Sequence, residues 1–118
     1  MIMYYDKHGN AIVHLQNNHL FDLRGKPLAF VSNKAVFNLR GKHLGYIEDG
    51  WIRDKRSCVV LYTDGHIGFG PIPPIHKIAP IPAIPAIPPI PPIPPIPPIP
   101  PVASASWSAL NATEFFNQ

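Results

Sequence analysis

The sequence predicts an all-β protein: four tandem 16-residue β-hairpin repeats close into a pseudo-four-fold ring, followed by an extended polyproline II segment. Two periodicities indicate this. Similar residues recur every 16 positions over residues 5–68, and isoleucine or valine recurs every third position from 72 to 102. Sixteen of the 17 prolines also lie beyond residue 70. We therefore divide the chain into a β-repeat domain (1–70), a proline rod (71–102) and a short tail (103–118).

The 16-residue repeat is visible at several phases of the first 70 residues. Gly9, Gly25 and Gly41 are spaced by sixteen, and Ser57 stands at the fourth place. Acidic or amide, aromatic and aliphatic residues recur with the same step: Asp6, Asp22, Asn38 and Asp54; Tyr5, Phe21 and Phe37 followed by Arg53; His14, Phe30, Tyr46 and Tyr62; Ile12, Leu28, Leu44 and Val60. A single hairpin cannot bury its apolar face alone, so we expect the units to share one closed core.

Each repeat reads as two short strands. In the second repeat, a D-x-x-G turn at 22–25 precedes an apolar run at 28–31, and a polar turn at 32–34 precedes another apolar run at 35–37. Aspartate and asparagine bond to backbone groups just ahead of them, and glycine accepts a positive φ, so both are typical of such turns. No clean 3.6-residue apolar period interrupts this pattern, and helices are therefore not expected in this domain.

The two ends of the repeat region predict how the ring closes. Residues 3–5 and 67–69 both occupy the phase of the second strand of a repeat. This gives five copies of the second strand against four of the first. We therefore expect the first and last copies to lie side by side and to protect an edge.

The repeats resemble a known family, the four-fold beta flower domain, over roughly residues 4–68. The resemblance is carried by the motifs at 22–29 and 38–47 and by the turn at 48–54, which contains Trp51. A proline-rich stretch followed by Trp107-Ser108 is also similar to tails in that family. The family is largely bacterial and implies a fold but no activity. Ser57 departs from the family pattern, which has glycine at this turn.

In the proline rod, eleven branched residues recur at every third position. Polyproline II has three residues per turn, so all eleven fall on one face of a semi-rigid rod about 90 Å long. Covering this stripe would release several kcal/mol. The candidate binding residues are Ile75, Ile78, Ile81, Ile84, Ile87, Ile90, Ile93, Ile96 and Ile99. Three interpretations stay open: a stiff spacer, a rod docked on copies of itself, on the β domain or on a partner, and a disordered collapsed segment.

The tail contains a second candidate binding element. Its apolar residues lie near helical spacing, with Ser106 as a candidate N-cap. It can serve as a docking peptide for a partner, or pack on its own β domain. The anchors would be Trp107, Leu110, Phe115 and Phe116.

The sequence indicates no catalytic or metal site. The five histidines of the first 70 residues occupy five phases of the repeat, so symmetry does not bring them together, and no H-x-x-x-H or cysteine-rich spacing accompanies them. The repeated aspartates are explained by their turns. Cys58 has Lys55 and Arg56 nearby but no local histidine as a base. We expect no cofactor, no metal and no enzymatic activity.

Basic residues flank the glycine positions of the turns and define a second candidate surface. If the turns gather at one end of the ring, six cations would form a basic rim able to bind nucleic acid, polyphosphate or an acidic protein. These residues are Arg24, Lys26, Arg40, Lys42, Lys55 and Arg56. The net charge of only +3 and the lack of interleaved aromatic residues do not favour nucleic acid.

The sequence therefore predicts a non-enzymatic structural or interaction protein, whose β-repeat head carries a proline rod and tail for self-assembly or partner docking. An anion-binding module is the alternative. The partner would be a protein, either a second copy or another chain. No signal peptide or transmembrane segment is visible, which favours the cytoplasm and leaves non-classical export open.

Overall fold

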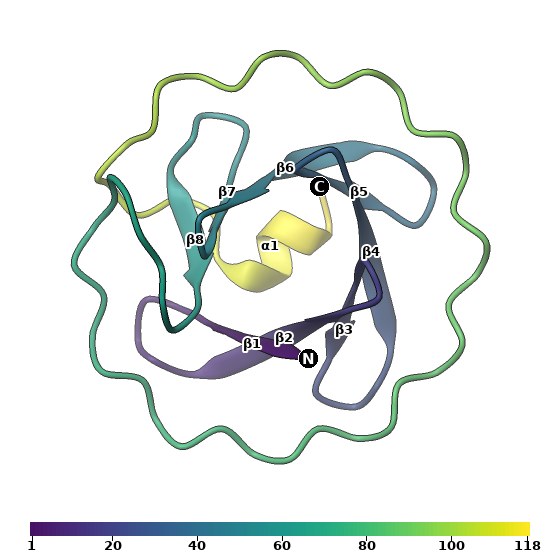
Figure 1. Cartoon of the computed structure of the whole chain (residues 1–118), viewed down its shortest axis with the longest axis horizontal. Helices are drawn as coiled ribbons and strands as arrows, with labels where there is room; N and C mark the ends of the chain where they lie inside the picture. Colours follow the sequence, from purple (N-terminus) through teal and green to yellow (C-terminus); the bar gives the residue numbers. More distant parts are fainter.

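The structure, a computed structural model, describes all 118 residues and contains eight strands and one short helix. The strands are β1 (Ile2–Tyr5), β2 (Ala11–Gln16), β3 (His19–Asp22), β4 (Pro27–Ser32), β5 (Ala35–Asn38), β6 (His43–Glu48), β7 (Trp51–Arg53) and β8 (Val59–Tyr62). Each strand pairs with the next, and β1 pairs antiparallel with β8 through Tyr5 and Tyr62, so the sheet is a closed barrel. The predicted all-β ring with four-fold pseudosymmetry is confirmed (Figure 1).

The predicted position of the closing strand was wrong. Residues 67–69 form no strand; instead, the backbone N–H of Ile67 donates to the carbonyl oxygen of Asp49 over 2.9 Å. The first three repeats are the hairpins β2–β3, β4–β5 and β6–β7. The fourth repeat has β8 as its first strand, and β1 takes the place of its second strand. Because β1 already covers the edge of β8, the chain after Tyr62 is free to leave the barrel.

Two kinds of turn alternate around the barrel. The turns within the three hairpins contain Asn17-Asn18, Asn33-Lys34 and Asp49-Gly50, and all six residues have positive φ. Positive φ at both central residues is the type I′ geometry, whose twist matches that of the flanking strands. These tight turns explain the polar pairs that separate the two strands of each repeat.

The D-x-x-G turns between repeats share one hydrogen-bonding pattern. In each, the side-chain Oδ1 of Asp6, Asp22, Asn38 or Asp54 accepts bonds of 2.9–3.0 Å from backbone N–H groups two and four residues ahead. Ser57 has a φ of +64°, in the same left-handed region as the glycines of the other turns. The fourth turn is therefore preserved despite its serine.

Apolar residues from every repeat fill the barrel. Tyr4, Leu20, Val36 and Ile52, which are spaced by sixteen, all lie in the same buried cluster. In a second row, Val13, Ala29 and Leu61 are fully buried, and Gly45 stands where a fourth side chain is expected. A Cβ on Gly45 would clash with the carbonyl oxygen of Arg53 on the neighbouring strand and would lie 2.8 Å from the ring of Phe115. The missing side chain therefore makes room both for the paired strand and for a residue of the tail.

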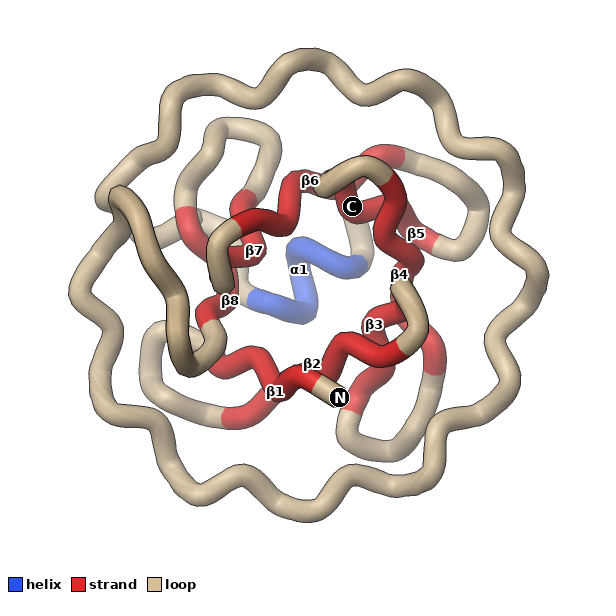
Figure 2. Tube along the Cα trace, in the orientation of Figure 1, coloured by secondary structure: helices blue, strands red, loops and turns tan.

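The tail ends in α1 (Ala112–Phe116), which lies within the ring of strands in the view of Figures 1 and 2. Ala112 and Phe116 line a cavity with Asp22 and Lys26, so α1 lies at the end of the barrel that carries the D-x-x-G turns. Its N-cap is Asn111, not the predicted Ser106: the Asn111 side chain accepts from the N–H of Glu114, whose carboxylate accepts from the N–H of Asn111. Phe115 is fully buried in the core cluster. With five residues, α1 is too short to span a bilayer, and the structure has no other helix.

Residues 71–102, which we call the belt, form no strand or helix and run around the outside of the barrel (Figure 2). The whole molecule measures 36 × 35 × 22 Å, so the predicted semi-rigid rod of about 90 Å does not project from the barrel but bends around it. At about 3.1 Å per residue, 32 extended residues span roughly 100 Å. That length is close to the perimeter of the disc, and both termini lie inside the ring in Figure 1.

Candidate functional site

The belt contacts the barrel at each D-x-x-G turn. The N–H of Lys77 donates to the carbonyl oxygen of Gly9 over 2.9 Å, and the N–H of Ala86 donates to that of Gly25 over 2.8 Å. At the third turn, a Cβ on Gly41 would lie 3.0 Å from the Pro92 ring. At the fourth turn, the Ser57 hydroxyl donates to the carbonyl oxygen of Pro101 over 2.8 Å. The four repeats thus hold the belt at successive points.

Two tyrosines of the same repeat phase measure how far the belt advances. The Tyr62 hydroxyl donates to the carbonyl oxygen of Pro74 over 2.8 Å, and the Tyr46 hydroxyl donates to that of Pro98 over 2.9 Å. Followed in the direction of the belt, from β8 past β1 and on to β6, Tyr46 lies three repeats beyond Tyr62. The two carbonyls that they bond are 24 residues apart along the belt, at positions 74 and 98. The belt therefore advances eight residues per repeat.

Interruptions of the proline pattern provide hydrogen-bond donors to the barrel. Proline has no N–H, so in an uninterrupted series of Ile-Pro-Pro triplets only the isoleucines could donate backbone hydrogen bonds. Lys77, Ala83, Ala86 and Ser104 replace proline or follow the last triplet, and each donates a backbone bond to a turn carbonyl. For example, Ala83 donates to Leu23 over 2.9 Å. These contacts were not predicted; the loss of proline at these places was the available signal.

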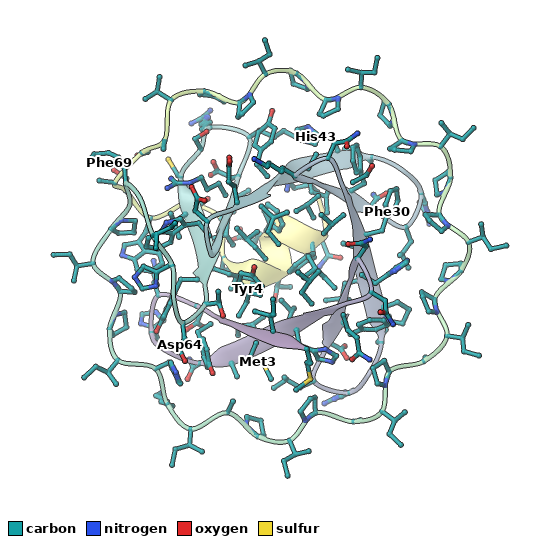
Figure 3. All side chains as sticks on the ribbon, viewed as in Figure 1. Met3, Tyr4, Phe30, His43, Asp64 and Phe69 are labelled. Atoms are coloured by element: carbon teal, nitrogen blue, oxygen red, sulfur yellow. The ribbon has the colours of Figure 1, made fainter.

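The branched residues of the belt all face solvent. Ile72, the nine isoleucines predicted as binding residues and Val102 are 92–98% exposed. Most residues that directly follow an isoleucine, such as Pro82, Pro85 and Pro88, are half-buried against the barrel. Figure 3 shows branched side chains pointing outward around the whole ring. The structure thus places the predicted stripe on one face, and this face is turned away from the barrel.

Polar contacts fix the beginning of the belt. His76 stacks on Tyr5 with ring centroids 3.8 Å apart, and its Nε2 lies 2.9 Å from a carboxylate oxygen of Asp64. The Lys77 carbonyl and the Asp64 carboxylate both raise the pKa of His76. The Lys77 ammonium donates to the Asn10 side chain over 2.7 Å. The first quarter of the belt is therefore held by side chains as well as by backbone.

Arg53 joins the two ends of the belt. Its guanidinium donates to the carbonyl oxygens of Ser57 (2.7 Å) and Ser104 (2.8 Å) and also to that of Phe69. Burial lowers the pKa of this guanidinium, which remains charged because arginine does not lose its proton in proteins. We call this meeting point of residues 67–70 and 100–104 the seam.

The tail residues predicted as anchors pack on the chain itself. Trp107 bridges to Val59 of β8 and stands edge-on to Tyr62, with ring centroids 6.2 Å apart. Leu110 and Phe116 are half-buried against the core cluster that contains Phe115. The structure therefore uses this segment to complete the barrel, which is the second of the two interpretations drawn from the sequence.

The six predicted cations are all exposed, and the structure brings only some of them together. Lys26 and Arg40 line one cavity of about 420 Å³ beside α1. Lys55 and Arg56 line another, of about 540 Å³, with Cys58 and Trp107. Arg24 and Lys42 line neither cavity. The structure thus gathers four of the six cations in two pairs, one pair at each cavity.

No three His, Cys, Asp or Glu side chains lie close enough together to hold a metal ion. His14 is the one histidine of the chain that is buried. It is fully buried, and neither ring nitrogen has a hydrogen-bond partner. Burial and the N-terminal ammonium lower its pKa, while Asp22 acts in the opposite direction. Sequence periodicity indicated the burial, since His14 shares its phase with Phe30, Tyr46 and Tyr62.

Fold and surface together define a small β-repeat protein, a four-fold hairpin barrel surrounded by its own proline-rich segment. The chain matches the family described as 4-fold beta flower protein over residues 2–116, and it belongs to that family. The match covers the belt and the tail as well as the barrel, so it extends well past the residues 4–68 that carried the resemblance. No curated protein and no solved structure matches the chain.

Proposed function

We propose that this chain is a non-enzymatic interaction module, and that the outward row of isoleucines on the belt is its docking surface for protein. The observation that carries the proposal is the exposure of eleven branched side chains, each 92–98% exposed, around the rim of the disc-shaped molecule. Monomeric proteins rarely expose apolar patches of more than a few hundred Å², and larger ones mark sites of interaction.

Folding of the chain does not require isoleucine at these positions. The belt is held by backbone N–H groups, by proline rings and carbonyls, and by side chains such as His76 and Lys77. None of these contacts uses an isoleucine side chain, so a belt with threonine or serine at these positions would make the same contacts with the barrel. Each isoleucine that a partner covers would contribute about 1.5–3 kcal/mol of transfer free energy. This gain favours association.

Replacing isoleucines by threonine tests the proposal without disturbing the belt backbone, because threonine is also β-branched. The variant carries threonine at Ile78, Ile84, Ile90, Ile96 and Ile99. It should unfold at the same urea concentration as the natural chain but lose association, with itself or with a protein from its native host, as measured by light scattering. Association that survives the substitutions, or its absence in the natural chain, would contradict the proposal.

The full chain is needed for this experiment. Phe115 lies in the barrel core and Arg53 bonds to both ends of the belt. A fragment that stops at residue 70 would therefore lack part of its core, and loss of association could reflect loss of the fold. The matched control is a double variant on the other candidate surface, Arg24→Ala with Arg40→Ala, which should leave association unchanged.

A second candidate function is binding of an anionic ligand beside α1. The cavity beside α1 is lined by two exposed cations, Lys26 and Arg40. A second cavity, near Trp107, is lined by Lys55 and Arg56 but also by Asp54, whose carboxylate disfavours an anion. Inorganic polyphosphate is a suitable probe, and its binding should weaken steeply with salt. The double variant Lys26→Ala with Arg40→Ala should bind at least several-fold more weakly than Arg24→Ala with Lys42→Ala. Equal affinities, or binding insensitive to salt, would exclude this function.

A further inference from the structure

We infer that the partner surrounds the belt: it is a protein with a concave apolar wall whose opening is slightly wider than the 36 × 35 Å disc. This inference rests on the proposed docking function and adds the shape of the partner. Three features of the belt support it, namely its uniformity around the ring, its convex form and the area that its side chains can bury.

The belt offers the same chemistry in every direction. An isoleucine or valine recurs every third residue from Ile72 to Val102, and the exposed fraction stays between 92% and 98% throughout. Lys77 is the only charged residue in the belt. An interface with a flat partner usually has an apolar centre and a polar rim. No arc of the belt has this composition.

The convex form of the belt limits what a second copy could cover. Two discs that meet edge to edge touch along a short arc, so only about three isoleucines of each copy would be covered, roughly 300 Å². A stable interface buries about 800 Å² on each partner. Most of the belt would also remain exposed, and further copies could add at any arc without closing the assembly.

A surrounding wall removes both difficulties. Each covered isoleucine buries on the order of 100 Å², so eleven of them supply about 1,100 Å², which exceeds the area of a standard interface on one partner. The polar ends of the barrel would stay in water on either side of the ring. The outward side chains in Figure 3 would all meet the same kind of surface.

Site-specific photo-crosslinking in the native host tests this arrangement. The photoreactive residue p-benzoylphenylalanine is placed, one site per variant, at Ile75, Ile84, Ile93 or Val102, which lie nine residues apart around the ring. Arg40 is the control position, because it is exposed but lies away from the belt isoleucines, at the cavity beside α1. We expect all four belt positions to yield the same crosslinked partner polypeptide and Arg40 to yield none.

The other outcomes overturn the inference, and they separate it from the proposed function. Crosslinks from one or two neighbouring belt positions would show docking on a single arc, which leaves the belt as a docking surface but excludes a surrounding partner. Products of twice the mass of the chain would show that a second copy covers the belt. No crosslink at any of the four positions would remove both the inference and the proposed function.

Discussion

Arg53 donates a hydrogen bond of 2.8 Å to the carbonyl oxygen of Ser104, 51 residues further along the chain. The same guanidinium bonds to Phe69, where the chain leaves the barrel to begin the belt. In the other three repeats this phase holds Tyr5, Phe21 or Phe37. The third repeat, hairpin β6–β7, has arginine because the belt begins and ends beside it, and only a side chain with several donors can bond to both ends and to the turn.

Replacing Arg53 by methionine should therefore open the seam. The substitution keeps an unbranched side chain that can pack like the arginine stem, but it leaves the carbonyls of Ser57, Phe69 and Ser104 without these donors. Hydrogen bonds to charged groups contribute about 1.5–3 kcal/mol each, and we expect a loss of about 3 kcal/mol in the free energy of unfolding. Urea denaturation measures the loss, and amide hydrogen exchange should increase at residues 102–106.

The control for Arg53 is Arg56→Met. Arg56 is exposed, and its side chain makes no hydrogen bond or ion pair. Its replacement should change stability by less than about 0.5 kcal/mol. If both variants unfold at the same urea concentration, Arg53 does not join the ends of the belt in solution.

Gly25 tests the contact between the belt and a turn. Its φ is +85°, and a Cβ there would lie 2.4 Å from the carbonyl oxygen of Ile84. Gly65 has a similar φ of +76° but nothing within 4 Å of a Cβ. Gly65→Ala should cost about 1 kcal/mol for backbone strain alone, and Gly25→Ala about 2–4 kcal/mol, because the belt must also move. Equal losses in urea denaturation would mean that the belt does not lie on this turn.

The barrel could be predicted from the sequence because one period governs it. The 16-residue step places Asp6 and its equivalents at turns and Tyr4, Leu20, Val36 and Ile52 in one buried row. Every repeat has the same local pattern of turns and strands, and this pattern is compatible with one closed sheet. Because local pattern and tertiary fold agree, the fold can be predicted from the sequence.

The path of the belt could not be predicted in the same way. A polyproline segment repeats every three residues, whereas the belt advances eight residues per repeat of the barrel, and eight is not a multiple of three. The contacts at successive turns, by Lys77, Ala86, Pro92 and Pro101, keep the same place in the triplet because they lie nine, six and nine residues apart. This unequal spacing is not apparent from the sequence, where Ala83 and Ala86 look like random departures from proline. Arg53 and Gly45 were visible as breaks in the 16-residue repeat, and both mark places where distant segments meet the barrel.

Phe115 tests whether the tail completes the barrel core. Its side chain is fully buried against Gly45, whereas the neighbouring Phe116 is only half-buried. Truncation of a buried phenylalanine costs about 3–5 kcal/mol, so Phe115→Ala should lower the free energy of unfolding by that amount. Phe116→Ala is the matched control and should cost about half as much or less. Similar small losses from both variants in urea denaturation would mean that α1 does not occupy the barrel.

His14 should make the fold sensitive to acid. Its ring is fully buried without hydrogen bonds, and it stacks on Phe21 with centroids 5.4 Å apart. Burial first and the N-terminal ammonium second lower its pKa below the usual 6.5, while Asp22 opposes them. Above pH 6.5 the ring is neutral in both states. Below it the unfolded chain binds a proton that the folded chain does not, so the free energy of unfolding decreases as the pH falls.

Replacing His14 by phenylalanine, the residue at the equivalent position 30, should remove this sensitivity. In urea denaturation, the free energy of unfolding of His14→Phe should exceed that of the natural chain. This excess should be larger at pH 5 than at pH 8. His43, whose pKa burial also lowers, should keep part of the acid response, and His76, whose pKa is raised, acts in the opposite direction. The exposed His8, replaced by glutamine, is the control and should follow the natural chain at both pH values. A constant difference between His14→Phe and the natural chain would show that protonation of His14 does not oppose folding.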